Sequence, residues 1–324
     1  MWNDTTLLKK GGFLINSTVK EPRINLKANL DLEDYVLIKA LQMQCLQKEQ
    51  ISLKLELDYK LGDALPILDN AGNQKRNEFM YFDDKQLVGY IGICSFGDTD
   101  TTLEITGMVH PDYRRQGIFF KLHDLVMSEC KRRNAERILL LCDRNSVSGQ
   151  EFLKGIGAVY QNSEYEMYLH AMPNEMGDER LPDLSFRKAT NADADEIARQ
   201  NAIYFGDREA IENNEIKSEG VILPEDEERR GMSIYLAEMD KQVIGKVHLQ
   251  INNDIGGIFG LGVLPEMRKM GFGRTILIKA IAMLKDAKAR EIMLQVATGN
   301  TSALGLYQSC GFRETSIMDY YELL

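Results

Sequence analysis

The stretch that decides the fold reads Ile258-Phe259-Gly260-Leu261-Gly262-Val263-Leu264-Pro265-Glu266-Met267-Arg268-Lys269-Met270-Gly271-Phe272-Gly273-Arg274. It begins as an apolar strand, turns after a proline into a loop with two glycines, and continues as a helix over about 275–288. Where a loop enters a helix, several backbone N–H groups lack intrahelical partners, and the helix dipole adds partial positive charge. Glycines let the backbone approach an anion closely. The stretch therefore predicts a binding site for a pyrophosphate group.

Side-chain charge supports the same prediction, because Arg268, Lys269 and Arg274 surround the loop. Taken alone, R-x-x-G-x-G is a weak pattern, and a simple glycine-rich helix start remains an alternative. Two rival phosphate motifs fail on context: a Walker loop needs a Gly-Lys-Ser/Thr ending, and a dinucleotide fingerprint sits early in a βαβ unit. Here a hairpin, predicted at 233–239 and 243–251, precedes the strand, which indicates a mixed sheet.

The chain contains this arrangement twice. Glu104–Phe119 matches the stretch above in order and spacing, with an offset of 154 residues from Pro111 to Pro265. Each copy continues into a helix, an apolar strand and a short helix ending in a glycine-containing turn. Such an offset indicates duplication of a whole domain. We therefore predict an α/β fold of two tandem domains, each a central mixed β-sheet flanked by helices. The domains are a first half at 1–170, a linker at 171–183 and a second half at 184–324.

Composition limits the classes of function. The chain has 324 residues with a net charge of −10 and no basic half, which argues against nucleic acid as a partner. Its five cysteines are odd in number and form no C-x-x-C pair, which favours a reducing compartment. The four histidines are scattered, so no metal site is expected. No apolar stretch approaches a signal peptide or a membrane span, so we expect a cytoplasmic protein without a membrane partner.

The whole arrangement resembles the GCN5-related N-acetyltransferase (GNAT) superfamily, over about 79–169 and 184–324. The family pattern N-x-x-A-x-x-L-Y-x-x-x-G-F appears as 300–312, from Asn300 through Tyr307 to Phe312. The resemblance implies acetyl-CoA as co-substrate, with the loop on its pyrophosphate and the V-x-P strand on its pantetheine arm. It implies that these residues bind it: Leu261, Val263, Arg268, Lys269, Met270, Gly271, Phe272, Gly273, Arg274 and Asn300, with Val109, Arg114 and Gly117 in the first half.

The resemblance also implies the chemistry. Tyr307 is expected to be the general acid that protonates the departing thiolate, and the Val263 N–H to polarise the thioester oxygen. The alternative for Tyr307 is plain packing of a helix on the sheet. Many members carry a glutamate at the start of the preceding strand, where this chain has 256–258, Gly-Gly-Ile. The base therefore stays open between Glu238, His248 and direct attack by an amine that loses its proton to water.

The first half departs from the pattern at three positions. Phe119 stands where the last small residue of the loop is expected, and Phe152 replaces the tyrosine. Glu104 lies one position off the usual glutamate, and strand alternation then predicts that it faces the other side. The first half is therefore expected to be degenerate. It would bind CoA weakly, complete the cleft of the second half, or serve as structure. This layout resembles that of the mycothiol synthases.

The leading hypothesis is an N-acetyltransferase that acts on a primary amine of a small molecule or a protein. The alternative is a non-catalytic CoA-binding module with a regulatory or structural role. The sequence does not name the acceptor, because acceptor contacts in this family come from variable segments, here about 201–228.

Overall fold

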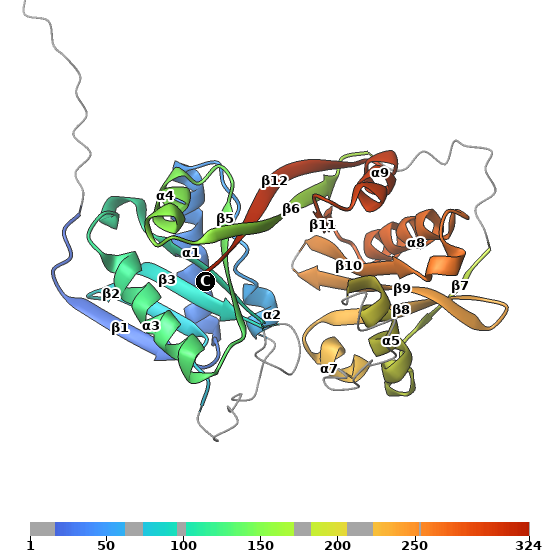
Figure 1. Ribbon diagram of the computed structural model, residues 1–324, viewed down its shortest axis with the longest axis horizontal. Helices are drawn as coiled ribbons and strands as arrows, with labels where there is room; N and C mark the ends of the chain where they lie inside the picture. Colours follow the sequence, from blue (N-terminus) through green and yellow to red (C-terminus); the bar gives the residue numbers. More distant parts are fainter. Residues whose placement is uncertain are drawn as a thin grey trace, which may run out of the picture.

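The structure is a computed structural model and describes residues 17–61, 74–95, 102–171, 183–205, 223–252 and 254–323. Two α/β halves lie next to each other and are joined by two long strands (Figure 1). The first half contains β1 (Pro22–Lys27), α1 (Leu32–Lys48), α2 (Leu57–Leu61), β2 (Glu78–Asp83), β3 (Gln86–Cys94), β4 (Thr102–Val109), a 3-10 turn (Pro111–Tyr113), α3 (Ile118–Arg132), β5 (Arg137–Asp143), α4 (Val147–Gly155) and β6 (Val159–Leu169).

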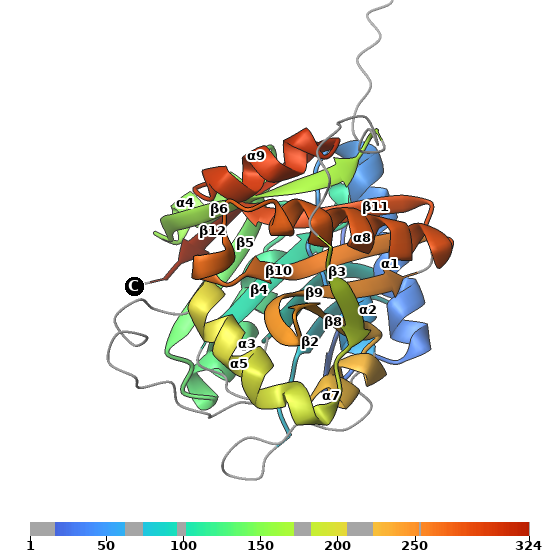
Figure 2. The same cartoon turned by 90° about the vertical axis from the view of Figure 1, so that its right-hand side faces the viewer.

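The second half repeats this order. It contains β7 (Ser185–Lys188), a 3-10 turn (Asn191–Asp193), α5 (Ala194–Phe205), α7 (Pro224–Arg229), β8 (Met232–Met239), β9 (Gln242–Asn252), β10 (Ile255–Val263), a 3-10 turn (Pro265–Met267), α8 (Phe272–Asp286), β11 (Glu291–Ala297), α9 (Thr301–Ser309) and β12 (Phe312–Glu322). In Figure 2, α8 lies on one side of β8, β9 and β10, and α5 and α7 lie on the other.

The two halves exchange their last strands. All strands form one 12-stranded sheet in the order β1-β2-β3-β4-β5-β12-β6-β11-β10-β9-β8-β7. β6, from the first half, pairs antiparallel with β11, and β12, from the second half, pairs antiparallel with β5. The exchanged strands also pair with each other, as the two strands that cross between the halves in Figure 1. Each half therefore depends on the other to complete its sheet.

Each exchanged strand also places side chains in the hydrophobic core of the other half. Met167 of β6 is fully buried in the core of the second half, under α8. Tyr321 of β12 packs against the core of the first half, under α3. A buried cluster at the seam joins Leu139 and Leu141 of β5 to Met318 and Tyr320 of β12.

A divergence of two parallel strands occurs in each half. β4 and β5 pair only over Thr102–Ile105 and Arg137–Leu140, and β10 and β11 only over Ile255–Ile258 and Glu291–Leu294. Beyond these residues the strands separate, so backbone groups on the facing edges are available to a ligand. Both predicted loops begin at this divergence.

The two halves differ in one backbone detail. In the second half, Phe259 pairs with His248 and Gly262 with Lys246, so two residues of β10 lie opposite one residue of β9. This is a β-bulge, a feature often found beside active sites. In the first half, β3 and β4 pair in continuous register over Gly89–Cys94 and Glu104–Val109.

The expected elements are largely confirmed. The hairpin of the second half turns at Asp240 and Lys241, both with positive φ, as the polar pair in the sequence predicts. All five cysteines are free and buried. Thr190 caps the 3-10 turn before α5, where the Asp193 carboxylate accepts the Thr190 N–H at 2.8 Å.

Most of the predicted linker, 172–182, lies outside the described residues, as do 1–16 and most of the expected acceptor segment, 206–222. Among the described residues, no helix is both long and apolar enough to cross a membrane.

Candidate active site

The glycine loop of the second half has the geometry expected of an anion site. Gly271 is left-handed, with φ +86°, and caps α8 without a side-chain hydrogen bond. The first intrahelical bond there runs from the Thr275 N–H to the Gly271 carbonyl, so the N–H groups of residues 272–274 lie ahead of the helical ladder. These groups and the helix dipole suit the pyrophosphate of CoA.

The end of β10 directs one backbone N–H into the divergence. The Leu264 N–H donates to the Ile244 carbonyl on β9, so the N–H and carbonyl of Val263 point to the opposite edge, where β11 has separated. The Val263 carbonyl accepts from Arg268 Nε at 3.0 Å. The Val263 N–H thus points into the gap between β10 and β11, which is the direction that the oxyanion role requires. The hydrogen bond from Arg268 stabilises the turn beside it.

The remaining predicted loop residues divide between core and surface. Phe272 is buried in the core, so only its backbone can contact a ligand, whereas Met270 is 55% exposed. Lys269 is exposed with φ +63°, and Arg274 donates to Ser309 Oγ at 3.0 Å. Leu261 packs against the core of the second half.

The loop position occupied by Gly273 shows why a small residue is needed. A Cβ on Gly273 would lie 3.5 Å from Leu306 of α9 and 3.8 Å from Val263 of β10. A larger side chain would fill the space between α9 and β10. In the first half Phe119 does this, with its ring centroid 4.7 Å from that of Phe152.

The tyrosine expected to act as the acid lies on α9. Tyr307 is 7% exposed and packs near Phe312, with 6.2 Å between ring centroids. Burial raises its pKa to about 12, so the hydroxyl holds its proton at neutral pH. No hydrogen bond to this hydroxyl is found within the described part of the chain. Asn300 caps α9, because its Oδ1 accepts the Ala303 N–H at 3.2 Å.

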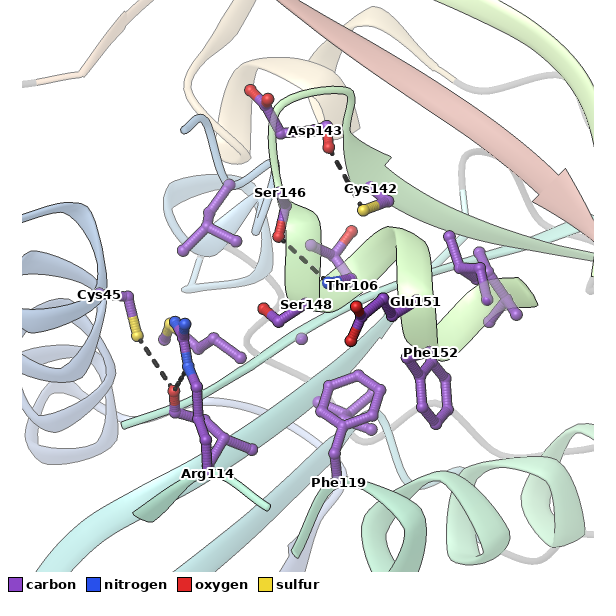
Figure 3. Close-up of a pocket in the computed structure, with 18 of the residues that line it drawn as sticks. Cys45, Thr106, Arg114, Phe119, Cys142, Asp143, Ser146, Ser148, Glu151 and Phe152 are labelled. Carbon is purple, nitrogen blue, oxygen red and sulfur yellow. Dashed lines mark hydrogen bonds between the residues drawn. The ribbon is translucent and has the colours of Figure 1, made fainter. Parts of the chain in front are cut away.

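A cavity of about 920 Å³ opens in the first half. Val109, Arg114 and Gly117 line it, together with the ends of β4 and β5 and the first turn of α4. Figure 3 shows Arg114 and Cys45 on one side and the rings of Phe119 and Phe152 on the other. Phe119 therefore narrows the cleft without closing it. A space of this size is typical of small-molecule sites.

Two lining residues of this cavity were not found from the sequence. Glu49, at the end of α1, forms an ion pair with Arg114. His123 of α3 is buried, and its Nε2 has no partner among the described residues. Burial lowers the pKa of His123, so the ring is neutral. Neither residue belongs to a motif, and only the helical spacing of His123 relative to Phe119 would have placed it near the loop.

Glu104 lies on the face of β4 that is turned toward α1. Met108 of β4 packs toward α1, and Glu104 lies on the same face, four residues away. Its Oε2 lies 3.6 Å from Lys54 Nζ. β4 has no bulge, so alternation runs unbroken from Val109 to Glu104. The side that Glu104 faces relative to the usual glutamate stays a prediction.

The two candidate bases of the second half have different surroundings. Glu238 accepts from Arg187 Nε at 2.7 Å, at the outer edge of the sheet between β7 and β8. His248 lies on β9 opposite the bulge, with its Nε2 3.0 Å from Lys246 Nζ. Only His248 is beside the divergence of β10 and β11.

Comparison with known proteins agrees with this geometry. The model of the Acetyltransferase (GNAT) family matches residues 41–158 and 197–312, once in each half. The chain belongs to this family. It is an N-acetyltransferase with two tandem GNAT units, and the family generally uses acetyl-CoA.

Curated relatives and a solved structure match the chain over different lengths. The chain is 25% identical over 244 residues to a mycothiol acetyltransferase from Paenarthrobacter aurescens, covering 70% of this chain and 72% of that protein. It is 28% identical over 148 residues to an N-alpha-acetyltransferase from Sulfolobus acidocaldarius, covering 42% of this chain and 83% of that protein. A solved tandem GNAT protein from the clavulanic acid biosynthesis pathway superposes with a TM-score of 0.66 at 15% identity, over 94% of this chain and 98% of that one. The expected resemblance to mycothiol synthase is confirmed.

Proposed function

We propose that the second half transfers the acetyl group of acetyl-CoA to a primary amine, with Tyr307 as the general acid. The observation that carries this proposal is a neutral, buried phenol on α9, behind a glycine loop that begins where β10 and β11 diverge. The first half has Phe152 at the equivalent position and cannot donate a proton there.

In this proposal the neutral amine attacks the thioester carbon directly. The Val263 N–H stabilises the negative charge that develops on the carbonyl oxygen. As the C–S bond breaks, the Tyr307 hydroxyl gives its proton to the sulfur, and the new amide nitrogen returns a proton to the phenolate. The residues around the loop hold the pyrophosphate and keep the thioester in place.

A small-molecule amine is the acceptor that we favour. The mycothiol acetyltransferase match extends over both halves, whereas the N-alpha-acetyltransferase match covers less than half of the chain. The net charge of −10 also suits a cationic ammonium compound.

The test is thiol release from acetyl-CoA by the full-length protein with a panel of primary amines, alongside thermal shift with acetyl-CoA alone. Turnover on at least one amine is expected. Stabilisation by acetyl-CoA without turnover on any amine would instead support a non-catalytic CoA-binding module.

A second function is favoured by the cavity in the first half. We propose that the first half binds CoA without catalysing transfer, through the loop at Arg114 and Gly117. Gly117 has φ +75° and caps α3 as Gly271 caps α8. Calorimetry with acetyl-CoA should then give two sites in the parent protein and one in a Gly117→Val variant.

A further inference from the structure

Gly260, in the β10 bulge, lies against a polar pair formed by Lys246 and His248. Lys246 of β9 is 0% exposed, and its Nζ lies 3.2 Å from the Gly260 carbonyl and 3.0 Å from His248 Nε2. Gly260 has φ +53°, and a Cβ there would approach Lys246 Nζ and His248 Cδ2 to 3.2 Å. A glycine at 260 is therefore needed both for the backbone conformation and for the space that the pair occupies.

The pair lies on the side of the sheet opposite α8. Gly245 faces Ile276 of α8, and Lys246, the next residue along β9, faces Tyr204 of α5. The Tyr204 ring lies where a Cβ of Gly262 would be, one residue before Val263. Lys246 is thus fully buried next to β10, the strand that carries the proposed oxyanion N–H, whereas His248 is partly exposed.

We propose that His248 is the base that takes the proton of the acceptor ammonium, and that Lys246 is a positioning residue that directs the free lone pair of His248 outward. This inference rests on the proposed acetyl transfer in the second half. It selects one of the two candidate bases, since Glu238 is paired with Arg187 away from the divergence.

The tautomer of His248 depends on the charge of Lys246. A neutral Lys246 can donate one N–H to the Gly260 carbonyl and accept the His248 Nε2–H, which leaves Nδ1 as a free acceptor. A protonated Lys246 can only donate, so it requires Nε2 to accept and forces the proton onto Nδ1. His248 is therefore a base only while Lys246 is neutral.

Burial makes the neutral form accessible. Because Lys246 is desolvated, its pKa falls to about 7. Burial and the adjacent Lys246 keep the pKa of His248 well below its usual range, so His248 alone is a weak base. Passing the proton to Lys246 gives the pair a basicity near neutral pH, where a general base is most effective.

Every proton that moves in this step has a donor and an acceptor. The ammonium gives one proton to Nδ1 of His248, and the Nε2 proton passes to Lys246 Nζ. The freed amine then forms the C–N bond as the C–S bond breaks, with Tyr307 protonating the sulfur. The proton held by Lys246 leaves to solvent through His248 before the next turnover.

The other groups that face the pair come from β8, β10, α5 and α7. β8 presents Ile234 and Leu236, and β10 presents Phe259 and Gly262. From α5, Tyr204 has its ring centroid 5.8 Å from Lys246 Nζ, and burial raises its pKa. The charged groups around Tyr204 and at the end of α7 are Glu196, Arg199, Glu266, Arg268, Glu227 and Arg230.

The direct test is NMR of the histidine side chains in the full-length protein, with His248 assigned by a His248→Gln variant. We expect the proton of His248 to move from Nδ1 to Nε2 as pH rises through about 7. A Lys246→Met variant should lose this change. A Lys279→Met variant, which removes a lysine on the opposite side of the same sheet, should keep it.

Two results would overturn the inference: a single tautomer of His248 from about pH 6 to 9, or an unchanged transition in Lys246→Met. If Lys246→Met does not fold, Lys246→Gln serves instead. The glutamine oxygen can accept the Nε2–H at every pH, so Nε2 should stay protonated below pH 7.

Turnover gives the second readout, with n-butylamine and an alanine-terminated peptide as acceptors. His248→Gln should lower kcat/KM by about 10²–10⁴-fold, and Lys246→Gln should abolish the rise in rate through pH 7. Full activity of His248→Gln would refute the role of base. A parent protein that acetylates neither amine counts against the proposed function, while the NMR titration still decides whether Lys246 sets the tautomer.

Discussion

Replacing Tyr307 by phenylalanine tests the division of labour between the halves. If the hydroxyl donates the proton to the thiolate, its loss should slow turnover by about 10²–10⁴-fold, equivalent to about 2.7–5.4 kcal/mol of barrier. The fold should barely change, because the hydroxyl has no hydrogen-bond partner among the described residues and the ring still packs beside Phe312. We expect the free energy of unfolding to shift by less than about 1 kcal/mol.

The assay is thiol release at saturating acetyl-CoA, with acetyl-CoA affinity measured by calorimetry. A loss of kcat with unchanged affinity identifies an interaction made in the transition state. Tyr235→Phe, a partly buried tyrosine of the same core, is the matched control and should keep full activity. Phe152→Leu in the first half should affect stability more than turnover. Near-full activity of Tyr307→Phe, with turnover abolished in a folded Gly117→Val variant, would refute the assignment.

The remaining predictions concern the loop and the exchanged strands. Gly271→Val should remove acetyl-CoA binding to the second half, as measured by calorimetry, because a side chain at φ +86° costs about 1–2 kcal/mol and crowds the anion site. The control Gly299→Val places its side chain in open space and should keep binding. Unchanged affinity of Gly271→Val would contradict the proposed anion site. A protease site placed within 172–182 should allow cleavage without separation of the halves in native size-exclusion chromatography; two separate peaks would argue against the strand exchange. Asp319 of β12 accepts from Arg144 at 2.7 Å and from Ser163 at 2.6 Å. Asp319→Ala should therefore lower the free energy of unfolding by about 2 kcal/mol, and the whole chain should still unfold in a single thermal transition. Two independent thermal transitions would count against one shared sheet.

The sequence predicts the strand–loop–helix units well because their signals are local. Gly271 must be left-handed for the chain to enter α8, and the proline at 265 ends β10, so both features are visible in the residues themselves. The repeat then assigns the same unit to the first half. Strand exchange has no such local signal. Nothing in the residues of β6 and β12 identifies the strand that lies beside each of them.

The site was predicted incompletely for a related reason. Along β9, Lys246, His248 and Gln250 alternate with Gly245, Val247 and Leu249, a pattern that normally indicates one face in solvent. In the structure α5 and α7 cover that polar face, and Lys246 becomes fully buried. Alternation distinguishes the two faces of a strand, but it does not tell whether the polar face meets water or a covered site. The bulge in β10 is likewise not visible in the spacing of apolar residues.

Because of the strand exchange, the first half remains structurally necessary even though it lacks the tyrosine. β11 would be left with an unpaired edge without β6, and β5 with an unpaired edge without β12, and such edges favour aggregation. The core under α8 would also lose Met167, a side chain with no exposed surface. The first half can therefore replace a proton donor with Phe152 and narrow its loop with Phe119 while it still supplies a strand that the second half needs. Because the packing requirement is separate from the chemistry, degeneracy at these two positions is no evidence that the first half is dispensable.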